Sequence, residues 1–157
     1  MERRAQALRR HYAGGRADAF ARRAARFWAA LHGTWLTPRR WVTLEVPGRR
    51  TGKATRFPLV MADVDGRWYL VSMLGECAWV WNVRAADGRA VLRHGRPRPV
   101  RLVEVPVAER APMVRRLVHR APGLAARTSP LDRHEPVEAF EEIAADHPVF
   151  RVLPADA

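Results

Sequence analysis

The sequence predicts an α+β fold with a mostly antiparallel, barrel-like sheet and flanking helices. Six strand-like runs rich in β-branched and aromatic residues occupy the middle and the end of the chain. Most of them follow one another through short turns, and Asp65-Gly66 is a strong signal for a hairpin. Helical segments come before, between and after these runs, and the regular strand–helix alternation of a parallel sheet is missing.

The first predicted element is a helix over residues 18–32. Its apolar residues Phe20, Phe27 and Leu31 recur at helical spacing, so we expect them to pack on the barrel. The alternative is that this arginine-rich helix makes peripheral contact with an anionic membrane surface. No run of 18 apolar residues exists in the chain, which excludes a membrane-spanning helix.

Three strands are predicted next. Residues 41–46 read as a strand rich in β-branched side chains, and residues 57–64 as its neighbour. The Asp65-Gly66 turn then returns the chain into a strand over residues 67–72.

A short helix over residues 78–86 follows, ended by Asp87-Gly88. Residues 90–94 and 98–105 form a second predicted hairpin, joined through Gly95-Arg96-Pro97. The second of these strands alternates polar and apolar residues, as a half-exposed strand does.

Two helices and a strand complete the predicted fold. The helices span residues 108–119 and 136–146, and the strand spans residues 149–153. The inward-facing positions of the helices are Met113, Leu117, Val118, Val137, Phe140 and Ile143.

The net charge of +12 says less about the function than its size suggests. Such a charge favours an anionic partner, but arginine and alanine are abundant together, which is typical of a genome rich in G and C. The position of an arginine is therefore more informative than the number of arginines. Cys77 is the only cysteine, and the N-terminus leads into no apolar signal-peptide core, so we expect a single domain in the cytoplasm.

A basic turn stands out between the first two predicted strands. Gly48 and Gly52 frame Arg49-Arg50-Thr51, and the only lysine of the chain, Lys53, follows directly. Glycine lets the backbone approach an anion closely, successive N–H groups can form an anion-binding nest, and arginine offers a planar fork to phosphate. The sequence therefore predicts a phosphate-binding loop here.

Catalytic and metal-binding motifs are missing from the sequence. No pair of histidines, and no histidine with Cys77, has the spacing of a zinc site, and no nucleophile elbow, Walker loop or dinucleotide fingerprint is present. We therefore expect no catalytic side chain and no metal. An enzyme of this kind takes its chemistry from a cofactor.

Four motifs of the chain, in their order along the sequence, resemble those of the deazaflavin-dependent nitroreductase family. The resemblance rests on Gly48-Arg49-Arg50-Thr51-Gly52, Pro58-Leu59, the strand that ends at Ser72 and the segment Trp79-Val80-Trp81-Asn82-Val83-Arg84-Ala85. It implies a split β-barrel of the FMN-binding-like kind and the coenzyme F420, a 5-deazaflavin. It also implies an F420H2-dependent reductase of the nitroreductase or quinone reductase type, acting on a quinone, enone or nitro compound.

The resemblance also implies roles for particular residues. The coenzyme's phosphate and acidic tail would contact the basic turn, and its ring would lie near the helix that follows Cys77. The implied coenzyme-binding residues are Arg49, Arg50, Thr51, Gly52, Lys53, Arg56, Pro58, Leu59, Ser72, Met73, Gly75, Ala78, Trp79, Val80 and Asn82. Asn82 would anchor the helix, and Arg84 would be structural or phosphate-facing.

Two details depart from the family pattern. Relatives often carry an arginine at the position of Thr55, whereas here it comes one residue later, at Arg56, which reverses the strand face. Tyrosines that relatives place over the ring have no counterpart near the C-terminus, so the proton donor is open. Of the two neighbouring tryptophans, we expect Trp79 to line the pocket, because residues two apart on a helix cannot share a face.

Several assignments stay open at this stage. We expect an N-terminal helical arm over residues 1–36 and a split β-barrel coenzyme domain over residues 37–157. The expected partners are a small-molecule electron acceptor, no specific nucleic acid, a membrane surface through residues 18–32, and a second copy in a homodimer. The alternatives are an FMN- or haem-binding split barrel and a basic nucleic-acid-binding module without catalysis.

Overall fold

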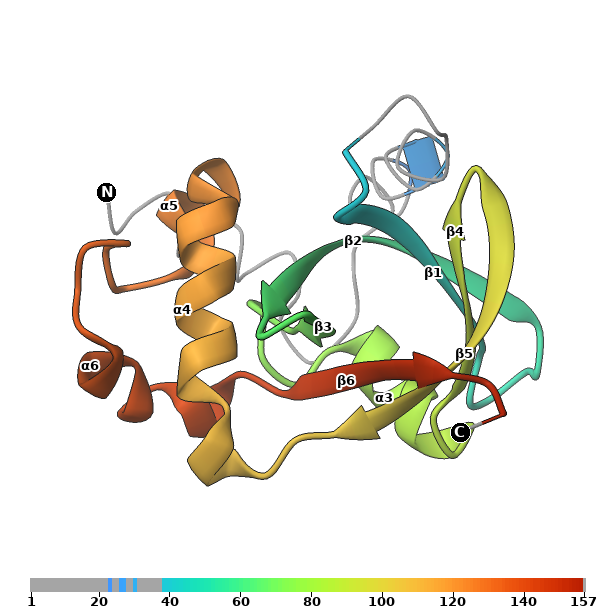
Figure 1. Cartoon of the computed structure of the whole chain (residues 1–157). Helices are drawn as coiled ribbons and strands as arrows, with labels where there is room; N and C mark the ends of the chain where they lie inside the picture. The colour runs from blue at the N-terminus through green and yellow to red at the C-terminus, as the bar shows by residue number, and fades with distance from the viewer. Residues whose placement is uncertain (1–22, 24–25, 28–29, 31–37, 157) are drawn as a thin grey trace.

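The computed structural model describes residues 23, 26–27, 30 and 38–156. Within that part, six strands form a closed barrel in the order β1-β2-β3-β6-β5-β4, and every neighbouring pair is antiparallel (Figure 1). The strands are β1 (Trp41–Pro47), β2 (Ala54–Val64), β3 (Arg67–Val71), β4 (Arg89–His94), β5 (Arg96–Glu104) and β6 (Val149–Pro154). The predicted α+β class and antiparallel barrel are confirmed.

Strand β2 begins three residues earlier than predicted and continues through a proline. Its first residues, Ala54 to Arg56, pair with Glu45 to Pro47 of β1, which extends the strand toward the basic turn. Pro58 lacks an N–H, but β3 pairs with β2 only from Met61 onward, so Pro58 has a single neighbouring strand. A proline is tolerated in a strand at such a position.

The predicted helix over residues 78–86 is confirmed as α3 (Ala78–Ala85). The segment 108–119 divides into a short 3₁₀ helix, η2 (Val107–Glu109), and α4 (Ala111–Arg120), whose first turn contains Pro112. The segment 136–146 likewise divides into α6 (Val137–Glu141) and η3 (Ala144–Asp146). Proline in the first helical turn explains why α4 begins where it does, because its missing N–H has no intrahelical partner there.

One helix has no counterpart among the predictions. It is α5 (Pro122–Thr128), which follows α4 almost directly. Pro122-Gly123 resembles a helix-breaking pair, but a proline at the first position of a helix starts it instead.

Only part of the predicted N-terminal helix lies within the described residues. Residues 23, 26, 27 and 30 are helical, and Phe20 and Leu31 lie outside the described part. Phe27 exposes 67% of its surface. Among the helices that the structure describes, none has the length and apolar character needed to cross a membrane. The division into an arm and a barrel domain stays a prediction.

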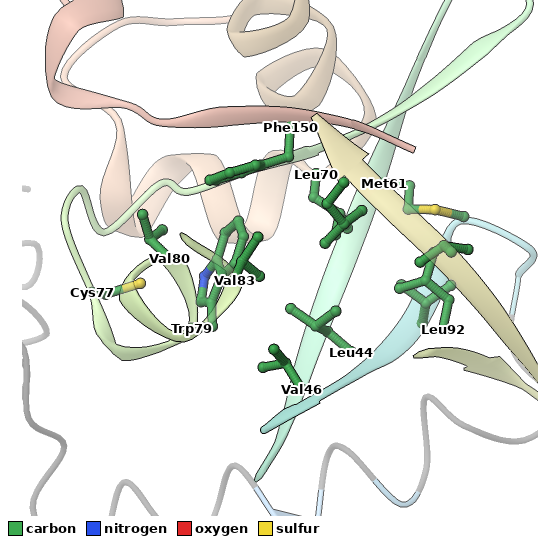
Figure 2. Packing of buried hydrophobic residues seen from close by; sticks show 13 residues of the cluster. Leu44, Val46, Met61, Leu70, Cys77, Trp79, Val80, Val83, Leu92 and Phe150 are labelled. Atoms are coloured by element: carbon green, nitrogen blue, oxygen red, sulfur yellow. The ribbon is translucent and has the colours of Figure 1, made fainter. Parts of the chain in front are cut away.

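The barrel interior and α3 share one hydrophobic cluster. Leu44, Leu70 and Phe150 point inward from the strands and meet Val80 and Val83 of the helix (Figure 2). Burial of such side chains is worth about 1.5–3 kcal/mol each relative to full exposure. Helix α3 is thus held in place by the core itself.

A second cluster covers the outer face of β2, β3 and β6. Helix α4 buries Val114, Leu117 and Val118 there, and Phe140 of α6 completes the packing. Tyr69 of β3 is also part of this cluster and is 5% exposed. The two clusters leave the turn between β1 and β2 at an edge of the barrel where α3 meets the strands (Figure 1).

Candidate functional site

The basic turn between β1 and β2 closes on itself through its glycines. The Gly48 N–H donates to the Lys53 carbonyl, and the Gly52 N–H donates to the Gly48 carbonyl, both at 2.8 Å. Gly52 has a φ of +67°, a left-handed conformation that favours glycine. A Cβ at Gly48 would lie 3.3 Å from both the Lys53 carbonyl oxygen and Thr51 Oγ1, so a side chain there would crowd the turn.

The predicted nest of backbone amides is largely wrong, because the turn uses most of these amides itself. Besides those of Gly48 and Gly52, the Lys53 N–H donates to Thr51 Oγ1 at 3.3 Å, and the Arg49 N–H donates to Asn82 Oδ1 at 3.1 Å. The Gly52 backbone is therefore not available to phosphate as expected. An anion at this turn can contact the cationic side chains and the backbone N–H groups of Arg50 and Thr51.

The side chains of the turn point out of the fold. Arg49, Arg50 and Lys53 are exposed, and neither Arg50 nor Lys53 forms an ion pair within the described part of the chain. Arg49 differs, because its Nη1 lies 3.5 Å from Asn82 Oδ1. The turn thus carries a compact positive charge, and no carboxylate of residues 38–156 forms an ion pair with it.

Asn82 of α3 connects this turn to the barrel. Its Oδ1 accepts from Arg49, and its Nδ2 donates to Thr55 Oγ1 of β2 at 3.2 Å. Thr55 in turn donates to the Val46 carbonyl of β1 at 2.7 Å. The expectation that Asn82 anchors the helix agrees with these contacts, whereas both polar atoms of its carboxamide are occupied within the protein.

Arg56 lies on the other face of β2 from Thr55. Its Nε donates to Glu45 Oε2 at 2.8 Å, and Arg93 Nε donates to the same oxygen at 3.0 Å. These hydrogen bonds, with Arg93 contributing most, hold the pKa of the Glu45 carboxyl below its ordinary value of 4.5. Arg56 is therefore engaged in a cross-strand ion pair, and the expectation that it extends the phosphate cradle is not supported by its geometry.

Pro58 and Leu59 cannot both face a ring, since neighbours on a strand point to opposite faces. Leu59 is half-buried and packs against the interior cluster, and it lies opposite Val42 of β1 in the strand register. Pro58 lies opposite Thr43 on the outer face and is also half-buried. Only one of the two can contact any given ligand.

The loop that leads from β3 into α3 is tied together internally. Ser72 is 2% exposed, and its hydroxyl donates to the Gly75 carbonyl at 2.6 Å and lies 3.4 Å from Cys77 Sγ. Met73 is 5% exposed and belongs to the outer cluster. Both side chains are used in packing, and the expectation that Ser72 and Met73 line a loop in contact with the coenzyme stays a prediction. Gly75 is half-buried with a φ of +73°.

The two tryptophans of α3 exchange their expected places. Trp79 is 5% exposed and packs on Phe150 with ring centroids 5.5 Å apart, so the prediction that its side chain lines a pocket is wrong. Val80 is fully buried beside it. Trp81 instead is 42% exposed, and the Arg84 guanidinium lies 5.2 Å from its ring centroid. Ala78, half-buried, lies on the same side of the helix as Trp81 by spacing.

Arg84 has a structural role. It donates to Glu76 at 2.6 Å and to Glu104 Oε1 at 2.7 Å, which ties α3 to the preceding loop and to β5. The pKa of the Glu104 carboxyl is lowered from 4.5, mainly by the hydrogen bonds from Arg84. Arg110 adds a further contact to Glu104 at 3.1 Å. Of the two roles expected for Arg84, the structure supports the first.

No acid–base or metal constellation appears in the part of the chain that the structure describes. That part holds no group of three or more His, Cys, Asp or Glu side chains that could hold a metal ion. His134 is exposed beside Asp132 and Arg133, and Tyr69 is buried in the outer cluster. Burial raises the pKa of the Cys77 thiol above 9.0, which makes it a poor nucleophile.

Sequence reasoning missed two residues of this region. Thr55 was noted only for not being an arginine, and Trp81 was expected in the core. The i, i+3 spacing of Ala78 and Trp81 was a usable signal, but α3 is apolar almost all round and its periodicity is weak.

Comparisons with known proteins agree with this arrangement. Residues 18–142 match a family described as F420H(2)-dependent quinone reductase. Among solved structures, an F420-H2 dependent reductase is 21% identical over 73% of this chain and 94% of its own, with a TM-score of 0.48. A protein of unknown function from Agrobacterium tumefaciens is 13% identical over 79% of this chain and 52% of its own, with a TM-score of 0.52. A FAD-binding protein from Mesorhizobium loti is 17% identical over 87% of this chain and 89% of its own, with a TM-score of 0.48.

Of these solved structures, the one from Agrobacterium tumefaciens concerns the fold alone, the other two carry no argument at TM-scores of 0.48, and the functional conclusion comes from the family match. A search of curated proteins gave no match. The family match confirms the F420 dependence that the sequence motifs implied, in preference to FMN, haem or nucleic acid as the ligand. Because the match over residues 18–142 includes the basic turn, five of the six barrel strands and α3, the chain belongs to the F420H2-dependent quinone reductase family.

Proposed function

We propose that this F420H2-dependent oxidoreductase reduces a quinone and that its basic turn holds the phosphate and acidic tail of the coenzyme. One observation carries the proposal: an exposed cationic turn is fastened to a buried helix by the hydrogen bond from the Arg49 amide to Asn82. A charged surface whose geometry is set beforehand loses less entropy when it binds an anion. Enones and nitro compounds are the alternative acceptors.

The residues of the turn fit the charge of the coenzyme tail. Arg50 and Lys53 are exposed and make no ion pair within the described residues, and Arg49 stands beside them. Arginine forks match phosphate and carboxylate oxygens in pairs, and lysine acts as a point charge. Thr51 adds an amide, although its hydroxyl already accepts from Lys53. Arg56 is engaged with Glu45 and adds only long-range positive charge.

The reduced deazaflavin, when bound, supplies the hydride. The protein's own residues bind the tail, orient the ring and exclude water. We assign contact with the ring to the exposed side of α3, which carries Ala78 and Trp81, because Trp79 and Val80 are buried in the core. Solvent supplies the proton in this proposal, since Tyr69 is enclosed and His134 lies on the α5–α6 connection.

Affinity for the coenzyme tests the assignment of the turn. Arg50→Ala should weaken binding of F420 by about tenfold or more, as expected for loss of a charge-assisted contact. Arg96→Ala is the matched control, because Arg96 is also exposed and begins the strand that follows the Gly95 turn between two antiparallel strands. Tryptophan quenching during titration gives both dissociation constants. Equal affinity of the two variants for F420 would show that this turn does not hold the coenzyme tail.

Two further partners remain predictions. A homodimer should appear in light scattering at twice the mass of 17.8 kDa. Contact of residues 18–32 with a membrane should appear as co-sedimentation with anionic liposomes that is lost when residues 1–33 are removed.

A further inference from the structure

The position of Asn82 is explained by its contacts within the protein and requires no contact with a ligand. Its side chain belongs to α3, yet it lies against the β1–β2 turn, 33 residues away in the sequence at Arg49. It is 4% exposed. Buried amides are kept where every polar atom has a partner.

The hydrogen bonds around Asn82 form a directed series. Arg49 donates to Oδ1 from its backbone at 3.1 Å and from Nη1 at 3.5 Å. Nδ2 then donates to Thr55 Oγ1 at 3.2 Å, and the Thr55 hydroxyl donates its single proton to the Val46 carbonyl at 2.7 Å. Each donor and acceptor is assigned uniquely, because a reversed amide would set its Nδ2 donor against the Arg49 N–H.

This series connects α3 to the hydrogen-bonded pair of strands β1 and β2 and to the turn between them. It joins α3 to the turn through Arg49, to β2 through Thr55 and, at one remove, to β1 through Val46. The turn's own hydrogen bonds close it from Gly48 to Lys53 but do not fix its direction relative to the barrel. The hydrogen bonds to Asn82 fix the orientation of the turn relative to the barrel.

We propose that Asn82 is a positioning residue that fixes the Arg49 backbone and guanidinium, and with them the basic turn, and that it does not itself touch the coenzyme. The inference rests on the proposed function in one respect, namely that the turn holds the coenzyme tail. Loss of Asn82 leaves the Arg49 N–H without its buried acceptor and the Thr55 hydroxyl without a donor.

Three variants separate this role from a general structural one. Asn82→Leu keeps approximate size and removes both polar atoms. Thr55→Val removes the acceptor for Nδ2 together with the donor to the Val46 carbonyl, and Thr55→Ser restores both. Thr128→Val is the matched control, because Thr128 is 1% exposed and donates to the Leu124 carbonyl in α5, away from the turn.

Two probes distinguish positioning of the turn from contact with the ring. They are oxidised F420 and the same deazaflavin without its phosphate and acidic tail. Asn82→Leu should weaken F420 binding by about tenfold and leave the tail-less probe within about twofold of the wild type. Thr55→Val should show a smaller loss of the same selectivity, and Thr55→Ser and Thr128→Val should match the wild type for both probes. Equal losses for the two probes, or no loss for either, would overturn the proposal.

Amide hydrogen exchange of the ligand-free protein supplies an independent readout. The Arg49 amide should exchange faster in Asn82→Leu, whereas the amides of Gly48 and Gly52 keep their partners within the turn. Should Arg50→Ala leave F420 binding intact, the tail site is wrong, and the exchange measurement still decides whether Asn82 holds the turn. Unchanged exchange at Arg49 in Asn82→Leu contradicts the role of Asn82 itself.

Discussion

Two of the glycine–arginine turns between antiparallel strands of this barrel are held differently, because the first is fastened to the interior by a hydrogen bond to α3 and the second has no such bond within the described residues. Gly48-Arg49-Arg50 follows β1, and Gly95-Arg96 follows β4. Since β1 and β4 pair in opposite directions, with Thr43 facing Arg93, these turns lie at opposite ends of the barrel. The first is held by Asn82 of α3, whereas the side chains of Arg96 and Arg98 make no ion pair or hydrogen bond within the described residues.

Exposed charge alone therefore does not distinguish the two turns. Both turns combine glycine with exposed arginines, in a chain whose net charge is +12. Only the first turn has its direction set by a helix packed in the core. The seating of α3 is therefore what distinguishes the two turns, and each prediction below tests it.

The largest effect is expected from Gly88→Ala, at the end of α3. Gly88 has a φ of +73°, and a Cβ there would overlap the carbonyl oxygen of Leu102, which belongs to β5. The two backbones are also joined by the Leu102 N–H, which donates to the Gly88 carbonyl at 2.8 Å. We expect a loss of about 3 kcal/mol in the free energy of unfolding, measured with urea.

Gly52→Ala provides the control for that prediction. Gly52 is also left-handed, at +67°, but nothing lies within 4 Å of a Cβ built there. Its cost should be limited to the conformational penalty of about 1–2 kcal/mol. Equal losses in the two variants would mean that α3 does not depend on the close approach at Gly88.

The strands and the site differ in how far the sequence predicts them. Strand runs and the Asp65-Gly66 hairpin follow from local chemistry, and the positive φ of both turn residues, 49° and 72°, is what that dipeptide supplies. The exposure of Arg50 and Lys53 could also be predicted from the sequence, because exposed charge in a turn is a local property. Local patterns suffice for these elements.

The remaining site residues depend on contacts between distant segments. Nothing in the turn sequence reveals that Asn82 accepts the Arg49 amide, so a free nest was the natural expectation. Trp79 and Trp81 are equally apolar neighbours on a helix with weak periodicity, and only the position of Phe150 decides which is buried. The sequence likewise does not reveal that the side chains of Ser72 and Met73 are buried within the protein.

A smaller effect is expected from acid, through the ion pairs that tie α3 to β5. The pKa of Glu104 is lowered in the folded protein, so its contribution to stability is present above about pH 4.5 and is lost as the pH falls through its folded pKa. Glu45 and Asp63 have lowered pKa values for the same reason and add to the loss. Urea unfolding between pH 7 and pH 3 should show the free energy of unfolding declining below about pH 4.5.

Glu104→Gln isolates the α3 contribution to that decline. Glutamine does not titrate, so the variant should be less stable than the wild type at pH 7 and should lose less stability between pH 5 and pH 3. The difference should be modest, because the Glu104 side chain is 30% exposed and solvent screens its pair with Arg84. Parallel pH curves for the two proteins would contradict a role for this pair in seating α3.

The smallest expected signal is the reactivity of Cys77, which precedes α3 at its N-cap position. The side chain is 5% exposed, and burial raises the pKa of its thiol while the hydrogen bond with Ser72 opposes only part of that rise. Because the thiolate is the reactive form, the folded wild type should show almost no modification by a small thiol reagent at pH 7.5, and unfolding in urea should restore it. Gly88→Ala should react faster than the wild type in the absence of urea, since displacement of α3 opens the site around the thiol, whereas Gly52→Ala should not. Rapid labelling of the wild type, or equal rates in the two glycine variants, would show that α3 opens independently of its contact with β5, and the distinction between the two arginine turns would then lose its structural basis.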